Sequence, residues 1–247
     1  NGNLYIGTGD DTEPFRSDGY APIDERPGAA NNDVQRTSAN TDDLRGKILR
    51  IHPETDGTYT VPSGNMFTPG TAKTKPEIYA MGFRNPFRFS VHPATGAIYA
   101  ADYGPDAAGD NANRGPAAIV EWNIISSPGF YGWPYCVGDN IAYNDYNFAT
   151  GQSSGKFNCD NPVNNSPNNT GLTQLPAARK ADVWYGNGAN GFKFPEMGDG
   201  GEAPMAFPAY QYNAANPSPT KFPAYFDQTP FFGEWSRNTM HEFRLDS

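Results

Sequence analysis

The sequence predicts an all-β protein, and three observations support that prediction. Aromatic residues make up 14% of the 247 residues, enough to supply much of a core although hydrophobic residues reach only 37%. Glycine (27) and proline (23) together form about a fifth of the chain, which favours many turns over long helices. No segment shows a sustained helical period of apolar residues.

Short strands are expected along most of the chain. Residues 1–10, NGNLYIGTGD, predict a turn that leads into a strand, and residues 95–104, TGAIYAADYG, repeat the pattern. Both segments run from glycine through an aliphatic residue and tyrosine to small residues and an acidic residue, a pattern that suits the inner strands of β-propeller blades. Further strands are expected at 46–51, from 77 onward, and at 118–125, 209–212, 230–233 and 241–245.

Two long polar inserts interrupt this pattern, at residues 11–43 and 138–200, the second being most polar up to residue 180. A blade needs four strands and about 40–50 residues, so the remaining segments account for three to four blades. A ring left open would expose bare sheet edges. We therefore expect residues 1–247 to form a partial β-propeller domain, a fragment whose partner is the remainder of its own propeller.

The formal net charge of -9 excludes some classes of function. Nucleic-acid binding is disfavoured because phosphate backbones attract basic patches. The chain has no Lys/Arg-rich run and no long apolar segment, so the sequence predicts neither membrane insertion nor docking on a membrane. Acidic residues are better suited to holding calcium through oxygen ligands.

Two cysteines, Cys136 and Cys159, lie in a stretch rich in Asn, Gly and Ser. They are either two unrelated thiols or a disulfide that constrains a long loop. Their spacing matches neither a redox C-x-x-C motif nor a zinc site. We favour the disulfide, which would stabilise the fold by about 3 kcal/mol. A disulfide indicates an oxidising location, secreted, extracellular or periplasmic.

Four motifs follow one another between residues 82 and 134. They are GFRNP at 82–86, YGPD at 103–106, EWNII at 121–125 and GFYGWP at 129–134. This order and spacing resembles the soluble quinoprotein glucose/sorbosone dehydrogenase family, in particular its secreted actinobacterial type. The flanking segments GD at 9–10, GKILR at 46–50 and FFGEW at 231–235 agree with the resemblance. The resemblance implies a six-bladed propeller.

The resemblance also implies a chemistry, in which the anomeric carbon of an aldose is oxidised with hydride transfer to pyrroloquinoline quinone (PQQ), and electrons then pass to an external acceptor. It places Arg84 and Asn85 at the cofactor, with Arg84 stabilising negative charge, which a permanent cation does well. It gives the backbone carbonyls of Gly104 and Pro105 to the calcium ion that holds the quinone. Asp10 would orient a histidine base, expected upstream of Asn1.

A second, structural calcium site is implied at Glu121, Tyr131 and the carbonyl of Val137. Asp139 is a nearby carboxylate candidate, although it matches no family ligand. Val120 departs from the family pattern, which usually has an acidic pair here.

Two features keep a different function open. Ser236 stands where the family has a cofactor-binding lysine, with Arg237 beside it as a substitute cation, and none of the three histidines replaces the expected base. Because a propeller need not catalyse a reaction, the alternative is a non-catalytic, calcium-stabilised propeller that binds glycans or a protein partner.

Overall fold

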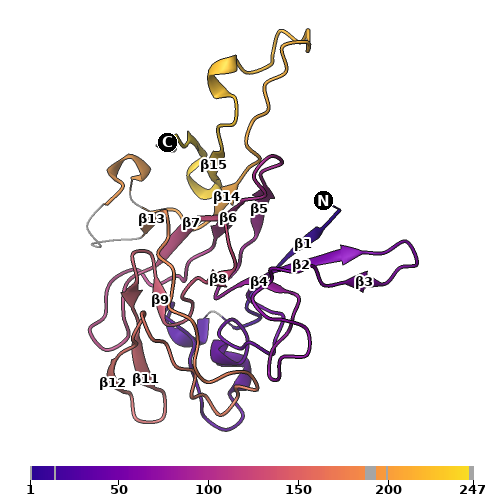
Figure 1. The fold of residues 1–247 in the computed structure, drawn as a ribbon. Helices are drawn as coiled ribbons and strands as arrows, with labels where there is room; N and C mark the ends of the chain where they lie inside the picture. Colours follow the sequence, from indigo (N-terminus) through magenta and orange to yellow (C-terminus); the bar gives the residue numbers. More distant parts are fainter. Residues whose placement is uncertain (1, 14, 187–192, 199, 245–247) are drawn as a thin grey trace.

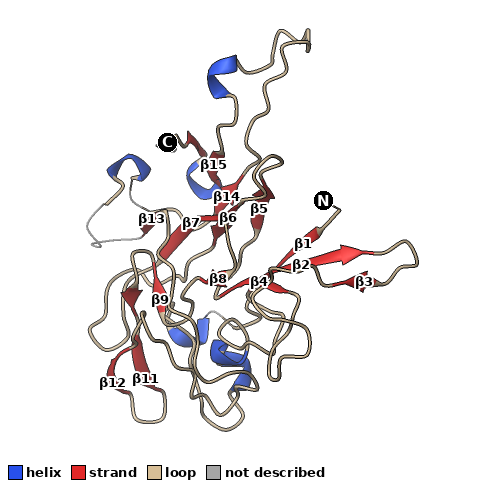
Figure 2. Ribbon diagram, viewed as in Figure 1, coloured by secondary structure: helices blue, strands red, loops and turns tan. Residues whose placement is uncertain are grey.

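The computed structural model describes residues 2–13, 15–186, 193–198 and 200–244. Within these ranges the regular elements are strands and single-turn 3-10 helices, which confirms the all-β prediction (Figure 2). The described residues contain no helix long and apolar enough to cross a membrane.

The first sheet contains the N-terminal strand. Its order is β1 (Leu4–Thr8), β2 (Lys47–Pro53), β4 (Ile78–Met81) and β8 (Gly129–Phe130), and β3 (Tyr59–Thr60) pairs with the end of β2. β1, β2 and β4 are antiparallel neighbours, whereas β8 runs parallel to β4. The hairpin of β2 and β3 extends away from the body, as Figure 1 shows.

The second sheet is a four-stranded antiparallel meander, the architecture of a propeller blade. Its order is β13 (Val183–Gly186), β7 (Ile119–Ile125), β6 (Ile98–Asp102) and β5 (Arg88–Val91). Side chains alternate along β6, because successive residues of a strand point to opposite faces. Ile98 and Ala100 pack against the first sheet, while Tyr99 and Ala101 pack toward the third.

The third sheet consists of β14 (Pro204–Ala206), β15 (Phe231–Glu234) and β16 (Thr239–Glu242), and β14 lies against β5, β6 and β7 (Figure 1). The apolar layer between the second and third sheets is built around Trp122, which stacks on Tyr99 and Phe243 at ring-centre distances of 5.7 and 4.5 Å. Successive sheets joined face to face by apolar layers are the arrangement of neighbouring propeller blades.

Two boundaries differ from the sequence prediction. Residues 209–212 form no strand, because backbone-to-backbone hydrogen bonds to the facing segment are made only at Tyr210: its N–H donates to the carbonyl of Thr229 and its carbonyl accepts from the N–H of Gln228. The second insert is shorter than residues 138–200, since β13 within that range pairs with β7. The expected strand at 241–245 is confirmed in part by β16; residue 245 lies outside the described residues.

Most of the remaining elements lie in or beside the two inserts. The first carries the 3-10 helices η1 (Phe15–Ser17), η2 (Ala30–Asn32) and η3 (Val34–Arg36). The second carries the hairpins β9 (Cys136–Val137) with β10 (Ile141–Ala142) and β11 (Asn144–Asn147) with β12 (Gln152–Lys156). Three further 3-10 helices are η4 (Pro195–Met197), η5 (Ala224–Phe226) and η6 (Trp235–Arg237).

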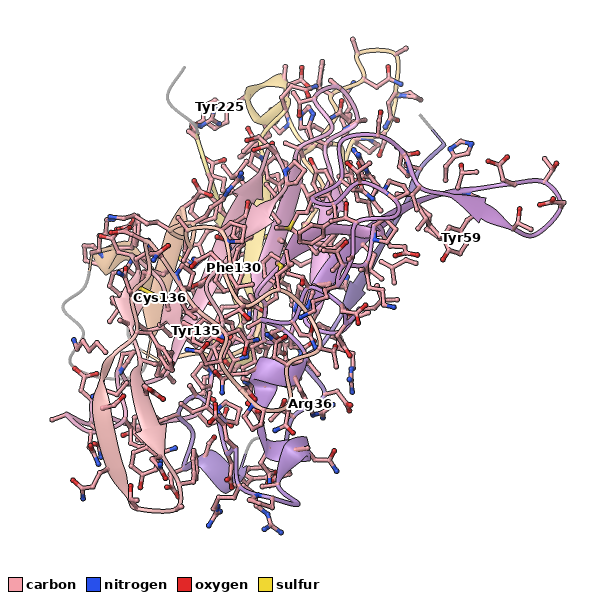
Figure 3. The ribbon with its side chains drawn as sticks, turned by 60° about the horizontal axis from the view of Figure 1, so that its bottom comes forward. Arg36, Tyr59, Phe130, Tyr135, Cys136 and Tyr225 are labelled. Atoms are coloured by element: carbon pink, nitrogen blue, oxygen red, sulfur yellow. A yellow bond between two sulfur atoms is a disulfide. The ribbon has the colours of Figure 1, made fainter. Side chains whose placement is uncertain are left out.

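The predicted disulfide is confirmed, with Cys136 and Cys159 joined at an S–S distance of 2.03 Å. Cys136 belongs to an apolar cluster with Phe130 and Tyr135, and Figure 3 shows these three side chains gathered in the interior. The bond therefore fastens the second insert to the first sheet.

Candidate functional site

Three of the predicted site residues line one small cavity. Asp10, Arg84 and Pro105 surround a space of about 10 Å³, together with Asp106 and residues of the first insert between 17 and 22. This is about the room that one water molecule needs. The inserted loop lies over the cavity because the carbonyl of Gly19 accepts a hydrogen bond from the N–H of Ala107.

Asp10 stands just beyond β1 and is buried. Its N–H donates to the carbonyl of Arg84 at 2.8 Å, so the two loops that carry the site are tied together. Its carboxylate accepts hydrogen bonds from Trp133 Nε1 at 2.9 Å and from the N–H of Thr12 at 3.1 Å. Burial raises the pKa of Asp10 to about 6, although these donors and the Arg84 charge act in the opposite direction.

The Arg84–Asn85 turn is held by a carboxylate that sequence reasoning missed. Asp102, the last residue of β6, accepts the N–H of Arg84 at 2.9 Å and that of Asn85 at 2.7 Å. Burial, together with the nearby charge of Glu121, raises the pKa of Asp102 well above its usual range. The available signal was its position in the repeated segment 95–104, two residues before the Gly-Pro pair.

The Arg84 and Asn85 side chains lie on the side of the turn that faces Asp10. The Arg84 guanidinium is 3.7 Å from the Asp106 carboxylate and remains 18% exposed. The Asn85 amide oxygen lies so near Gly9 that a Cβ there would be only 3.3 Å away. The arginine is thus partly available at the cavity.

Gly104 and Pro105 are both buried. A side chain on Gly104 would overlap the carbonyl of Ile119, so the close approach of β7 already requires glycine here. No group within the described ranges donates a hydrogen bond to the carbonyl oxygen of Gly104 or Pro105. Pro105 lines the cavity and Gly104 does not, and unpaired carbonyl oxygens of this kind fit the calcium ion that the resemblance implies.

The second predicted calcium set does not fit a metal. Glu121 is buried and accepts hydrogen bonds from the N–H of Gly138 at 2.5 Å and from Asn123 Nδ2 at 3.2 Å. Burial raises the pKa of Glu121 to about 7. Asp139 is held instead by Lys180 and Lys193, at 2.9 and 3.3 Å.

The other two members of that set are also engaged elsewhere. Tyr131 stacks on Phe83 at a ring distance of 5.0 Å, and Val137 pairs with Ile141 in a hairpin. No group of three or more His, Cys, Asp and Glu side chains in the described part of the chain could hold a metal ion. Because hydrogen-bond donors already bind Glu121 and lysines already bind Asp139, we derive no calcium site from this set of residues.

Arg237, the expected substitute cation, clamps a loop. Its guanidinium donates to the carbonyls of Met197 and Gly200. Ser236 donates its hydroxyl to Glu234 at 2.5 Å. Neither side chain lines the cavity of Asp10 and Arg84.

Lys47, like Asp102, is a buried ionisable residue, and the sequence pattern placed it only in a strand. Its ammonium donates to the carbonyls of Thr37, Ser38 and Arg45 at 2.8, 3.1 and 2.7 Å. Burial lowers the pKa of Lys47 to about 7. Lys47 holds the carbonyl of Ser38, and the Ser38 hydroxyl donates to the carbonyl of Phe83 at 2.6 Å. Through Ser38, Lys47 therefore supports Phe83, the residue before Arg84.

Stacked blades and a carboxylate–arginine cavity at the ends of β1 and β4 define a β-propeller with a candidate polar active site. Residues 1–167 match the family described as Glucose / Sorbosone dehydrogenase. The chain belongs to this family.

Among curated relatives, the HIPL2 protein of Arabidopsis thaliana is 30% identical over 132 residues, which are 48% of this chain and 17% of the relative. The HIPL1 protein of the same plant is 28% identical over 140 residues, 51% of this chain and 18% of the relative. A solved glucose dehydrogenase superposes with a TM-score of 0.50 at 19% identity, covering 99% of this chain and 47% of that one. This last likeness supports the propeller fold, and the chain spans less than half of that structure.

Proposed function

We propose that the protein containing this chain is a PQQ- and calcium-dependent sugar dehydrogenase that oxidises the anomeric carbon of an aldose and passes the electrons to an external acceptor. The observation that carries the proposal is the meeting of Asp10, Arg84 and Pro105 at one cavity. Family membership supports it, because these residues stand in the motifs of the family.

The site residues have two roles, to bind the cofactors and to stabilise charge. When bound, the quinone supplies the hydride acceptor. The carbonyls of Gly104 and Pro105 would hold the calcium ion, and Arg84 and Asn85 would hold the quinone. Arg84 brings a fixed positive charge into a partly buried site, where a charge stabilises developing negative charge more strongly than it does in water.

Asp10 acts as a positioning residue. Its carboxylate is fixed by Trp133 Nε1 on one oxygen and by the N–H of Thr12 on the other, and it can accept a further N–H. The resemblance assigns that N–H to a histidine base. Because the pKa of Asp10 is about 6, the ionised form that accepts such a bond prevails above that pH.

The test is dye-linked oxidation of a panel of aldoses by the full-length protein after reconstitution with PQQ and calcium. Arg84→Ala is expected to lower kcat by about 100-fold. Arg88→Ala is the matched control, since Arg88 lies exposed at the start of β5 and should keep wild-type activity. Failure to oxidise any aldose, or equal rates for Arg84→Ala and the wild type, would contradict the proposal.

The second candidate is a non-catalytic propeller that binds glycans or a protein. The occupied guanidinium of Arg237 and the serine at position 236 favour it, because neither offers a free cation in place of the missing lysine. Titration of PQQ into the calcium-loaded protein separates the two: the enzyme binds the quinone and the non-catalytic propeller does not.

We also infer an oxidising location, extracellular or periplasmic. The Cys136–Cys159 disulfide supports this inference, because such bonds persist where thiols are not kept reduced. Mapping of the disulfide in protein from the native host, with thiols blocked at lysis, tests it: a reduced pair would contradict the inference.

A further inference from the structure

A second pocket lies between the two inserts. It has a volume of about 400 Å³ and is lined by residues between 23 and 27 of the first insert and by residues of the β11–β12 hairpin. This volume falls in the range of small-molecule sites, about 300–1,000 Å³. No residue lines both this pocket and the Asp10 cavity.

One wall of the pocket is aromatic and rigid. Tyr146 and Phe148 meet edge to face with ring centres 5.0 Å apart, and both rings are half-buried. Behind them the Arg114 guanidinium, whose side chain is only 7% exposed, lies 4.2 Å from the Tyr146 ring centre and 4.9 Å from that of Phe148. Arg114 is itself held by the carbonyl of Ser17. The rings are thus fixed before any ligand arrives, which lowers the entropy cost of binding.

The rim of the pocket carries hydrogen-bonding groups. Glu25 accepts from Gln35 Nε2 at 2.8 Å through one carboxylate oxygen, and Asp145 accepts from the Ser154 hydroxyl at 2.7 Å through one of its own. The second oxygen of each carboxylate has no hydrogen-bond donor among the residues that the structure describes. Asn147, at the tip of the hairpin, adds an amide. The two carboxylates can accept hydrogen bonds from hydroxyls, and Asn147, whose amide oxygen already accepts from the N–H groups of Ala149 and Thr150, offers its Nδ2 as a donor.

This combination selects a class of ligand. A sugar ring has an apolar C–H face that packs on aromatic rings, and its hydroxyls donate to carboxylates. Arg26 also lines the pocket, but its guanidinium is bound by the Asp24 carboxylate at 2.6 Å. The two carboxylates at the rim disfavour phosphate and other anions. We propose that this pocket binds a neutral saccharide unit of a glycan without reacting with it. The proposal goes beyond the dehydrogenase function and needs neither quinone nor calcium.

The test is affinity electrophoresis of the purified protein in native gels that contain xylan, barley β-glucan, galactomannan or soluble starch. The wild type is expected to be retarded by at least one of these polysaccharides. The double variant Glu25→Gln/Asp145→Asn should bind it about tenfold more weakly, because two charged acceptors are lost. Saturation-transfer NMR with the matching disaccharide should lose its signal in the same variant.

The matched control is Glu54→Gln/Asp56→Asn, which makes the same charge change at two exposed residues after β2 and should keep wild-type retardation. Arg84→Ala should also keep it, so failure of the dehydrogenase proposal leaves this one standing. Absence of retardation in all four polysaccharides would overturn the pocket proposal. So would binding that the control variant loses, or binding that depends on Arg84.

Discussion

The second and third sheets meet in an apolar layer, whereas the two inserts combine an apolar cluster with buried polar contacts. Between the second and third sheets, Trp122, Tyr99 and Phe232 form an apolar layer. Between the inserts, Ile23 and Val34 pack with Tyr143 in an apolar cluster, and buried polar contacts add to it. Asn164 Nδ2 donates to the carbonyls of Gln35 and Ala39 at 2.8 and 3.0 Å, across more than 120 residues of sequence. The comparison shows that a polar segment need not be a surface loop when its hydrogen bonds are satisfied internally.

Asp33 is the centre of the polar contact between the inserts. It is fully buried and accepts from the Ser166 hydroxyl at 2.5 Å, Asn168 Nδ2 at 2.9 Å and the N–H of Gln35 at 3.0 Å. Asn164 opens an Asn-Asn-Ser sequence that has the pattern of a glycosylation acceptor, yet it is only 1% exposed. Its amide is used for folding.

The largest expected effect is in the apolar layer. Trp122→Ala removes a side chain that is 1% exposed, so it should lower the free energy of unfolding by about 3–5 kcal/mol. Urea unfolding followed by circular dichroism measures this. Trp235→Ala, at a tryptophan that is 69% exposed, should change the free energy of unfolding by less than about 1 kcal/mol. Equal losses in the two variants would show that the layer does not dominate stability.

The disulfide comes next. Cys136→Ala/Cys159→Ala should cost about 3 kcal/mol, because the unfolded chain regains the freedom of the closed loop. The loss should appear first as faster proteolysis within residues 138–180, before the sheets unfold. Cleavage that begins in the sheets would contradict the separation of the two regions.

Asp33→Asn tests the polar contact. An amide in place of the carboxylate meets donors on every side, so the variant should lose about 2 kcal/mol of unfolding free energy. Asp160→Asn, at an exposed position in the second insert, is the control and should lie within about 0.5 kcal/mol of the wild type. Hydrogen exchange should speed up around 164–172 in the first variant only.

The smallest effect is a dependence on pH at Asp10. Its pKa rises from 3.8 to about 6 on folding, so the folded chain holds the proton more tightly than the unfolded chain. The contribution of this group to stability therefore falls as pH rises from about 4 to about 6. Relative to Asp10→Asn, the wild type should lose about 1–2 kcal/mol of unfolding free energy between pH 4.5 and 6.5. A difference that does not change with pH would contradict the raised pKa.

Much of the fold could be predicted from the sequence because strand patterns are local. The repeated segments at 1–10 and 95–104 became β1 and β6, each followed by an antiparallel partner, β2 or β7. The strand expected at 209–212 was wrong because strand pairing depends on the facing segment, which forms backbone-to-backbone hydrogen bonds with it only at Tyr210.

The candidate site shows the same limit. The motifs predicted that Asp10 and Arg84 belong together, and they line one cavity. The supporting residues Asp102 and Lys47 were missed, because their roles lie in hydrogen bonds to distant backbone groups. The resemblance placed Glu121 in a calcium site, and Asp139 was a nearby candidate that matched no family ligand. The sequence could not reveal that Gly138 and Asn123 donate to Glu121 and that lysines pair with Asp139.

The most direct test of the account is a crystal structure of the full-length protein with PQQ and calcium. The account predicts a calcium ion within about 2.3–2.6 Å of the carbonyl oxygens of Gly104 and Pro105, with Arg84 against the quinone. A calcium ion bound elsewhere, or these two carbonyls turned away from the quinone, would contradict it.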